Sequence, residues 1–164
     1  MADNADYFLR IQGVEGECIK KGFEGTMEMF DWGFSEHQDG TASGGQSSAA
    51  GRVSMSDFRF SKQVDSSTPK LLQHLFTGKQ IPLATLTGRR TGEAGGKPVN
   101  YMVWEFKDLI ISSFSFNGNN GSGTPTESIS FCFASVKLNY RQMKDGVAQG
   151  ALAGGWDMRR NTVV

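Results

Sequence analysis

The sequence predicts a mainly β protein that carries one short α-helix. Helical spacing of apolar residues occurs in one segment, 66–78, whereas extended patterns dominate most of the remaining chain. A single short helix is incompatible with parallel sheets whose strands are connected by helices, the architecture of most nucleotide-binding enzymes. We therefore look for function on the surfaces of a β-scaffold.

The helical segment has clear start and stop signals. Pro69 suits the first helical position, because its missing N–H would have no partner there, and Thr68 can cap from just before it. Gly78 predicts the end of the helix, since glycine readily adopts the left-handed conformation found there. Apolar residues at helical spacing predict one buried face, formed by Leu71, Leu72, Leu75 and Phe76.

The rest of the chain predicts strands and turns. Asparagine–glycine pairs at 117–118 and 120–121 predict a hairpin, because both central positions of that turn tolerate positive φ. Residues 127–140 are apolar on both faces at their start and half polar later, which fits a small closed barrel or a sandwich. The expected strands are 7–14, 26–34, 52–64, 81–87, 127–140 and 154–161, and the long extended segment 99–116 is either two strands or one bent strand.

Two of these strands carry polar side chains at alternate positions. Strict alternation in 110–116 places Ile111, Ser113 and Ser115 on one face of the strand. The same rule places Asp31 on one face of 26–34 together with two methionines.

Residues 38–51 form a fourteen-residue stretch without a large apolar side chain. We expect a long flexible loop at 38–51, and two interpretations remain open. It is either a plain surface loop or an arm that becomes ordered on contact with a neighbouring molecule, since loops of this length are uncommon in compact domains and often functional.

Length and charge exclude several classes of function. At 164 residues, we expect 1–164 to form a single domain. The 17 basic and 17 acidic side chains cancel, which argues against nucleic acid or an anionic membrane as a partner. Cys18 and Cys132 lack metal-ligand spacing, and two free thiols are favoured over a disulfide.

Targeting signals are not evident in this sequence. The acidic start, residues 1–6, has no basic or apolar region of a signal peptide. No apolar run approaches the ~20 residues that a membrane-spanning helix needs. We expect synthesis in the cytoplasm, and any export must use a route other than the general secretory one.

The residues do not form a recognisable catalytic or cofactor site. His74 is expected within the helix as an ordinary structural residue, and His37 precedes the long loop, where a base would be poorly held. The glycine-rich segment 92–96 lacks the features of a phosphate-binding loop. The paired arginines at 89–90 and 159–160 are expected to be solvated or salt-bridged. We therefore expect no enzyme, no cofactor and no metal.

Four phrases of the sequence form a recognisable series: DWGFS at 31–35, DSSTPKL at 65–71, IISSFS at 110–115 and GWDMRRN at 155–161. No phrase is decisive alone, but their order and spacing are specific. Together they resemble the haemolysin-coregulated protein (Hcp) family, the tube protein of bacterial type VI secretion. The resemblance extends from the first strand to about Asn161.

This resemblance implies a small closed antiparallel β-barrel with one flanking helix, related to phage tail tubes. It implies a homo-hexameric ring that stacks into a tube in the cytoplasm and is secreted without a cleaved signal peptide. Effector proteins in the lumen, and sheath and spike or baseplate proteins, would be partners. The residues we assign to lumen and effector contact are Asp31, Ile111, Ser113 and Ser115. Those assigned to ring stacking are Gln38, Asp39, Gly40, Gly44, Gly45 and Gln46.

Two other classes of function remain as alternatives. A stand-alone ligand- or glycan-binding barrel would use exposed tryptophans among Trp32, Trp104 and Trp156 as stacking platforms. An enzyme would need a site assembled from residues distant in sequence, which the pattern does not indicate.

Overall fold

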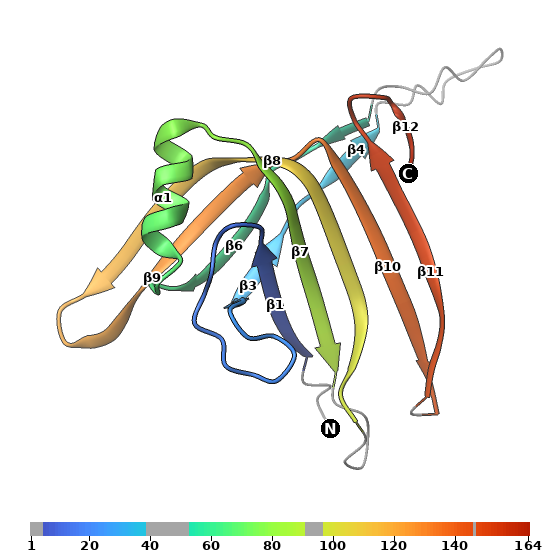
Figure 1. Ribbon diagram of the computed structural model, residues 1–164, viewed down its shortest axis with the longest axis horizontal. Coiled ribbons are helices and arrows are strands. Elements are labelled where there is room, and N and C mark those ends of the chain that lie inside the picture. The colour runs from blue at the N-terminus through green and yellow to red at the C-terminus, as the bar shows by residue number, and fades with distance from the viewer. Residues whose placement is uncertain (1–4, 39–52, 91–96, 146) are drawn as a thin grey trace.

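The computed structural model describes residues 5–38, 53–90, 97–145 and 147–164 (Figure 1). Within these ranges one helix accompanies short and long strands, as the sequence predicts. Of the residues assigned to ring stacking, Gln38 ends β4, whereas Asp39, Gly40, Gly44, Gly45 and Gln46 lie outside the described residues. The elements are β1 (Ala5–Ile11), β2 (Met27–Glu28), β3 (Asp31–Gly33), β4 (Glu36–Gln38), β5 (Val53–Met55), β6 (Phe58–Gln63), α1 (Thr68–Thr77), β7 (Ile81–Arg90), β8 (Val99–Asn119), β9 (Ser122–Cys132), β10 (Ser135–Lys144), β11 (Val147–Asp157) and β12 (Thr162–Val163).

The long strand β8 belongs to two antiparallel sheets. Its residues 99–109 pair with β7 and β10 in a first sheet, ordered β12-β11-β10-β8-β7-β1-β2. Its residues 110–119 pair with β9 in a second sheet, ordered β8-β9-β6-β3. Asp108, at the junction, has a φ of 55°. The change of partner lets one strand build both sheets, and β8 bends visibly between its two parts (Figure 1).

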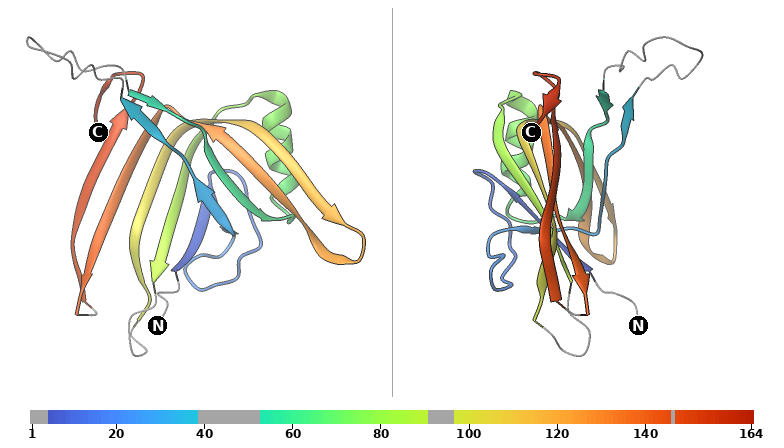
Figure 2. Two further views of the ribbon diagram at one scale, coloured as in Figure 1. Left: turned by 180° about the vertical axis from the view of Figure 1, so that it is seen from behind. Right: turned by 90° about the vertical axis from the view of Figure 1, so that its right-hand side faces the viewer.

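The expected closed barrel is wrong, because pairing stops at β2 on one sheet and at β3 on the other. Two residues lie between β2 and β3, and each donates a backbone hydrogen bond to a different sheet. Met29 N–H donates to Tyr7 O at 3.4 Å in the first sheet, and Phe30 N–H donates to Ser61 O at 2.9 Å in the second. This segment therefore crosses between the sheets as a corner. The β4–β5 hairpin and α1 lie on opposite sides of the first sheet (Figure 2).

The expected strand 127–140 is two strands in different sheets, β9 and β10. Residues 133–134 between them leave the ladder, so the alternation predicted along this segment is interrupted. Only one face of its start is buried, because Ile129, Phe131 and Phe133 lie in the core, whereas on the other face Ser130 is half-buried and Cys132 is exposed.

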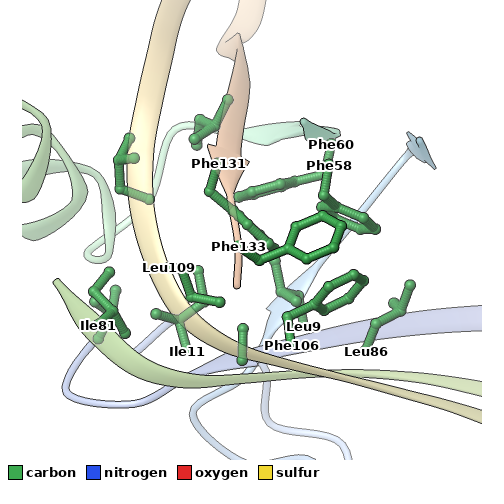
Figure 3. Packing of buried hydrophobic residues seen from close by; sticks show 14 of the residues in the cluster. Leu9, Ile11, Phe58, Phe60, Ile81, Leu86, Phe106, Leu109, Phe131 and Phe133 are labelled. Carbon is green, nitrogen blue, oxygen red and sulfur yellow. The ribbon is translucent and has the colours of Figure 1, made fainter. Parts of the chain in front are cut away.

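The core lies between the two sheets and is dominated by phenylalanine (Figure 3). The rings of Phe58 and Phe131 lie 4.9 Å apart, and those of Phe58 and Phe106 also 4.9 Å. Phe106 meets Phe133 edge-on at 5.0 Å. Such offset and edge-to-face contacts add to the burial of large apolar surfaces. The high phenylalanine content of the sequence thus supplies much of the core.

The start of α1 is held by buried charges. Lys62, 1% exposed, lies 2.5 Å from the Glu127 carboxylate and 2.7 Å from that of Asp65. The hydroxyl of Thr68 donates to the Glu127 carboxylate at 2.9 Å, so it is engaged with β9 and does not cap the helix. Ser67 occupies the N-cap position and Thr68 is the first helical residue, which corrects the expected cap.

Asp65 completes this cluster from the helix side. Burial raises the pKa of its carboxyl, but hydrogen bonds from Lys62 and Ser67 and the charge of Lys62 outweigh it, so that the pKa is lowered from 3.8. The Ser67 N–H donates to Asp65 Oδ1 at 2.9 Å. The negative form of Asp65 is therefore the one that the fold stabilises.

The rest of α1 partly follows the sequence. Gly78 ends the helix with a φ of 62°, as predicted. Leu71 is buried, but Phe76 is 78% exposed and does not belong to the buried face. His74 lies on the buried face instead, with 9% of its surface exposed. Its Nδ1 has no hydrogen-bond partner among the described residues. Leu71 and His74 are three residues apart, the spacing that places side chains on one helix face.

We predict that Lys62→Met lowers the free energy of unfolding by roughly 3–5 kcal/mol, because it leaves the Glu127 carboxylate buried without its cation. Chemical denaturation of the purified variant measures this loss. Arg159→Met is the matched control, since it breaks an ion pair with Asp108 between side chains 61% and 39% exposed and should cost at most about 1 kcal/mol. Equal losses in the two variants would contradict a stabilising role for the buried cluster.

Candidate functional site

The second sheet has one face made almost entirely of small or polar side chains. Its strands alternate, so that Phe58, Phe60, Ile129 and Phe131 face the core while their neighbours face the other way. The register aligns these neighbours in rows across the sheet. The rows are Gly33–Arg59–Ser130–Ser113, Asp31–Ser61–Ser128–Ser115 and Gln63–Thr126–Asn117. We call this surface the polar face.

Three of the four residues that the sequence assigns to the lumen share the polar face. Asp31 and Ser115 lie in one row, although they are distant in sequence, and Ser113 lies in the next row. All three are exposed. The tertiary structure therefore places together the polar residues that alternation selected separately in two strands.

Ile111 does not share this face, and its assignment beside Ser113 and Ser115 is wrong. A register shift falls between Ile111, which pairs with Phe131, and Ser113, which pairs with Ser130. The extra residue, Ser112, forms a β-bulge, and one extra residue exchanges the two faces of a strand. Ile111 is consequently 2% exposed and belongs to the core.

The bulge has a second effect on this surface. The Ser112 hydroxyl donates a hydrogen bond to the Asp57 carboxylate, which precedes β6. Asp57 lies with Asp31, Arg59 and Ser130 around an open hollow of about 610 Å³. Asp57 is two residues before Arg59, so alternation places it on the same side and we include it in the polar face. The charged side chains of this face thus gather at one end of the second sheet.

Both cysteines are free thiols, which confirms the interpretation from the sequence. Cys132 is exposed and alternates with buried Phe131 at the end of β9, on the side of Ser130. Cys18 is buried, and its thiol donates to a Glu28 carboxylate oxygen at 3.3 Å. Cys132 is therefore a natural reporter for the polar face.

The other residues considered from the sequence are the paired arginines, a histidine and potential metal ligands. Arg89 pairs with Asp6 at 3.1 Å, and Arg159 pairs with Asp108 at 2.8 Å, as expected for salt-bridged arginines. His37 is exposed in β4. The described residues contain neither a cluster of three or more potential metal ligands nor a helix long and apolar enough to cross a membrane.

The tryptophans are half-buried rather than openly displayed. The ring of Trp32 lies 6.0 Å from that of Phe58, and Trp104 meets Phe34 edge-on at 5.0 Å. Trp104 and Trp156 also line an apolar groove of about 430 Å³ on the first sheet. Neither indole N–H has a partner among the described residues.

The chain matches known proteins along most of its length. A family model described as "Type VI secretion system effector, Hcp" matches residues 8–140. Protein hcp1 of Pseudomonas aeruginosa is 34% identical over 158 residues, which cover 95% of this chain and 96% of that protein.

The chain belongs to the Hcp family.

Solved Hcp structures have the same fold. Hcp1 from Salmonella typhimurium has a TM-score of 0.79 at 27% identity, and the match covers 98% of this chain and 99% of that one. A structure described as a type six secretion system protein has a TM-score of 0.88 at 23% identity, covering 98% and 100% of the two chains. Hcp membership confirms the resemblance found in the sequence and connects the protein to type VI secretion.

Sequence reasoning missed several residues of the polar face. Ser61, Ser128 and Ser130 complete the rows, and Arg59 adds a positive charge. The signal was present, since Ser128 and Ser130 alternate with Ile129 and Phe131, and Arg59 alternates with the phenylalanines of β6. Only the pairing of β6 with β9 shows that these alternations belong to one surface.

We predict that alanine substitutions on the two sides of Ser112 differ strongly in their effect on stability. Ile111→Ala should lower the free energy of unfolding by about 2–5 kcal/mol, because it leaves a cavity in the core. Ser113→Ala should change it by no more than about 0.5 kcal/mol, because that side chain is exposed. Urea denaturation of both variants measures the difference. Similar losses at both positions would contradict the exchange of faces at Ser112.

Proposed function

We propose that this Hcp protein is a structural subunit of the inner tube of a type VI secretion system. Six copies form a ring, the polar face lines its lumen, and stacked rings form the tube. The protein is exported with effector proteins that it carries inside. The observation that carries this proposal is a serine-rich sheet face lying between two open strand edges.

The open edges are those of β3 and of residues 110–119 of β8. Within the described residues, β3 pairs only with β6, and this part of β8 pairs only with β9. An unpaired edge invites another strand, and head-to-tail pairing that closes into a ring removes free edges altogether. Pairing β8 of one copy with β3 of the next would extend the second sheet around the lumen.

The polar face suits a conduit. Small hydroxyl side chains keep a surface hydrated and offer adaptable hydrogen bonds to different proteins. Buried Phe58 and Phe131 behind this face hold it rigid. We further propose that 38–51 is the arm that contacts the next ring, that sheath and spike or baseplate proteins surround and cap the tube, and that the role is structural rather than enzymatic.

We predict that the purified protein has the mass of six chains by light scattering and appears as rings in negative-stain images of the same peak. A monomer at high concentration would count against spontaneous ring formation. It would favour instead a stand-alone binding protein that uses the apolar groove beside Trp104 and Trp156, whose unpartnered indole N–H groups are the observation supporting that second function.

We predict that Ser115→Tyr leaves the ring intact but weakens the retention of co-expressed effector proteins, because a bulky ring would project from the polar face into the lumen. Co-purification of effectors with the tagged subunit measures retention, and light scattering checks the ring. Gln73→Tyr is the control, since Gln73 is exposed on α1, away from the polar face. Undiminished retention with Ser115→Tyr would remove this residue from the lumen.

A further inference from the structure

The polar face carries an ordered set of charges. Among the described residues of this face, Asp57, Arg59 and Asp31 are the charged side chains. Asp57 precedes β6, Arg59 lies two residues further on, and Asp31 pairs with Ser61, two residues beyond Arg59. The charges therefore follow one another along the sheet as negative, positive and negative.

These charges do not cancel one another through ion pairs. Neither Arg59 nor Asp31 forms a salt bridge or a side-chain hydrogen bond with another described residue, and both are exposed. Diagonal neighbours in a sheet are about 7–8 Å apart, which is too far for a direct contact unless the side chains extend toward each other. Asp57 accepts its hydrogen bond from the neutral Ser112, so its charge is not compensated either.

The described residues of this face carry one surplus negative charge per chain, in contrast to the zero formal charge of the whole protein. Repetition around a ring would multiply this surplus. A concave wall of low dielectric constant concentrates the field of its charges and raises the local concentration of oppositely charged partners. In physiological salt the effect reaches about 8 Å, which is enough for a protein that touches the wall.

We propose that the polar face selects cargo by charge and prefers proteins with a basic surface, with Asp31 as the principal contact and Arg59 as the residue that limits affinity. This inference rests on the proposed function, because it assigns a class of cargo to the same lumen. The Asp31 carboxylate has no side-chain partner among the described residues, whereas the Asp57 carboxylate accepts a hydrogen bond from Ser112. Asp31 is therefore the carboxylate freer to approach a lysine or arginine of the cargo.

Charge variants of opposite sign test this proposal with a defined probe. Cytochrome c, a small and strongly basic protein, is added to purified rings at low salt, and its affinity is measured by fluorescence anisotropy. We expect Asp31→Ser to weaken binding roughly fivefold and Arg59→Gln to strengthen it by a similar factor, as loss of one partly screened charge contact implies. α-Lactalbumin, which is acidic and of similar size, should bind wild-type rings more weakly than cytochrome c.

Glu15→Gln is the matched control, because it removes one negative charge at an exposed residue outside the polar face. Cys132 locates the bound probe, since cytochrome c in the lumen should slow the reaction of this exposed thiol with a maleimide, while buried Cys18 stays unreactive. Forms of the two probe proteins without free thiols are used, so that labelling reports on the ring alone.

Three results would overturn the inference while leaving the proposed function intact. The first is an equal loss of cytochrome c affinity in intact rings of Asp31→Ser and of Glu15→Gln. The second is weaker cytochrome c binding by Arg59→Gln rings. The third is a Cys132 thiol that reacts with the maleimide as fast with bound cytochrome c as without it. A wild-type chain that stays monomeric and does not bind cytochrome c would overturn both the tube function and the inference. Loss of binding in high salt, together with the expected order of the variants, would support selection by charge.

Discussion

The change of pairing partner along β8 is the constraint on which the rest of the structure depends. A strand of 21 residues is too long for one strongly twisted sheet of this size, and here its two parts serve different sheets. The first part carries β7 and β10, and the second carries β9. The phenylalanine core fills the angle between the sheets, so that the bend, the core and the polar face all follow from this division.

The helix is attached to this frame by charge as well as by apolar contact. Lys62, Asp65, Thr68 and Glu127 join β6, the helix start and β9 behind the polar face. Buried ion pairs often add little net stability compared with apolar residues, but loss of one partner is strongly destabilising because it leaves a buried charge uncompensated. The cluster therefore defines where α1 begins, and the backbone of the polar face is supported from behind.

The polar face and the open edges are the two features that support the proposed function. Serine rows on β8 and β9 form a hydrated surface, and the edges of β3 and β8 offer pairing to further copies. Hcp membership agrees with such an assembly. Asp31, Asp57 and Arg59 add a charge pattern to the otherwise neutral polar face, and this pattern is the basis of the proposed preference for basic cargo.

The sequence by itself determined the β class and the single helix with its end at Gly78. It also determined that Ser113 and Ser115 share one face of a strand, and that the chain belongs to the Hcp family. These depend on local propensities and on the order of motifs, which are readable along the chain. Only the tertiary structure decided that the barrel is open, that Thr68 binds Glu127 instead of capping, and that Arg59 joins Asp31. It also placed Ile111 in the core, because a bulge of one residue exchanges the faces of a strand, and register between distant strands is not encoded in local periodicity.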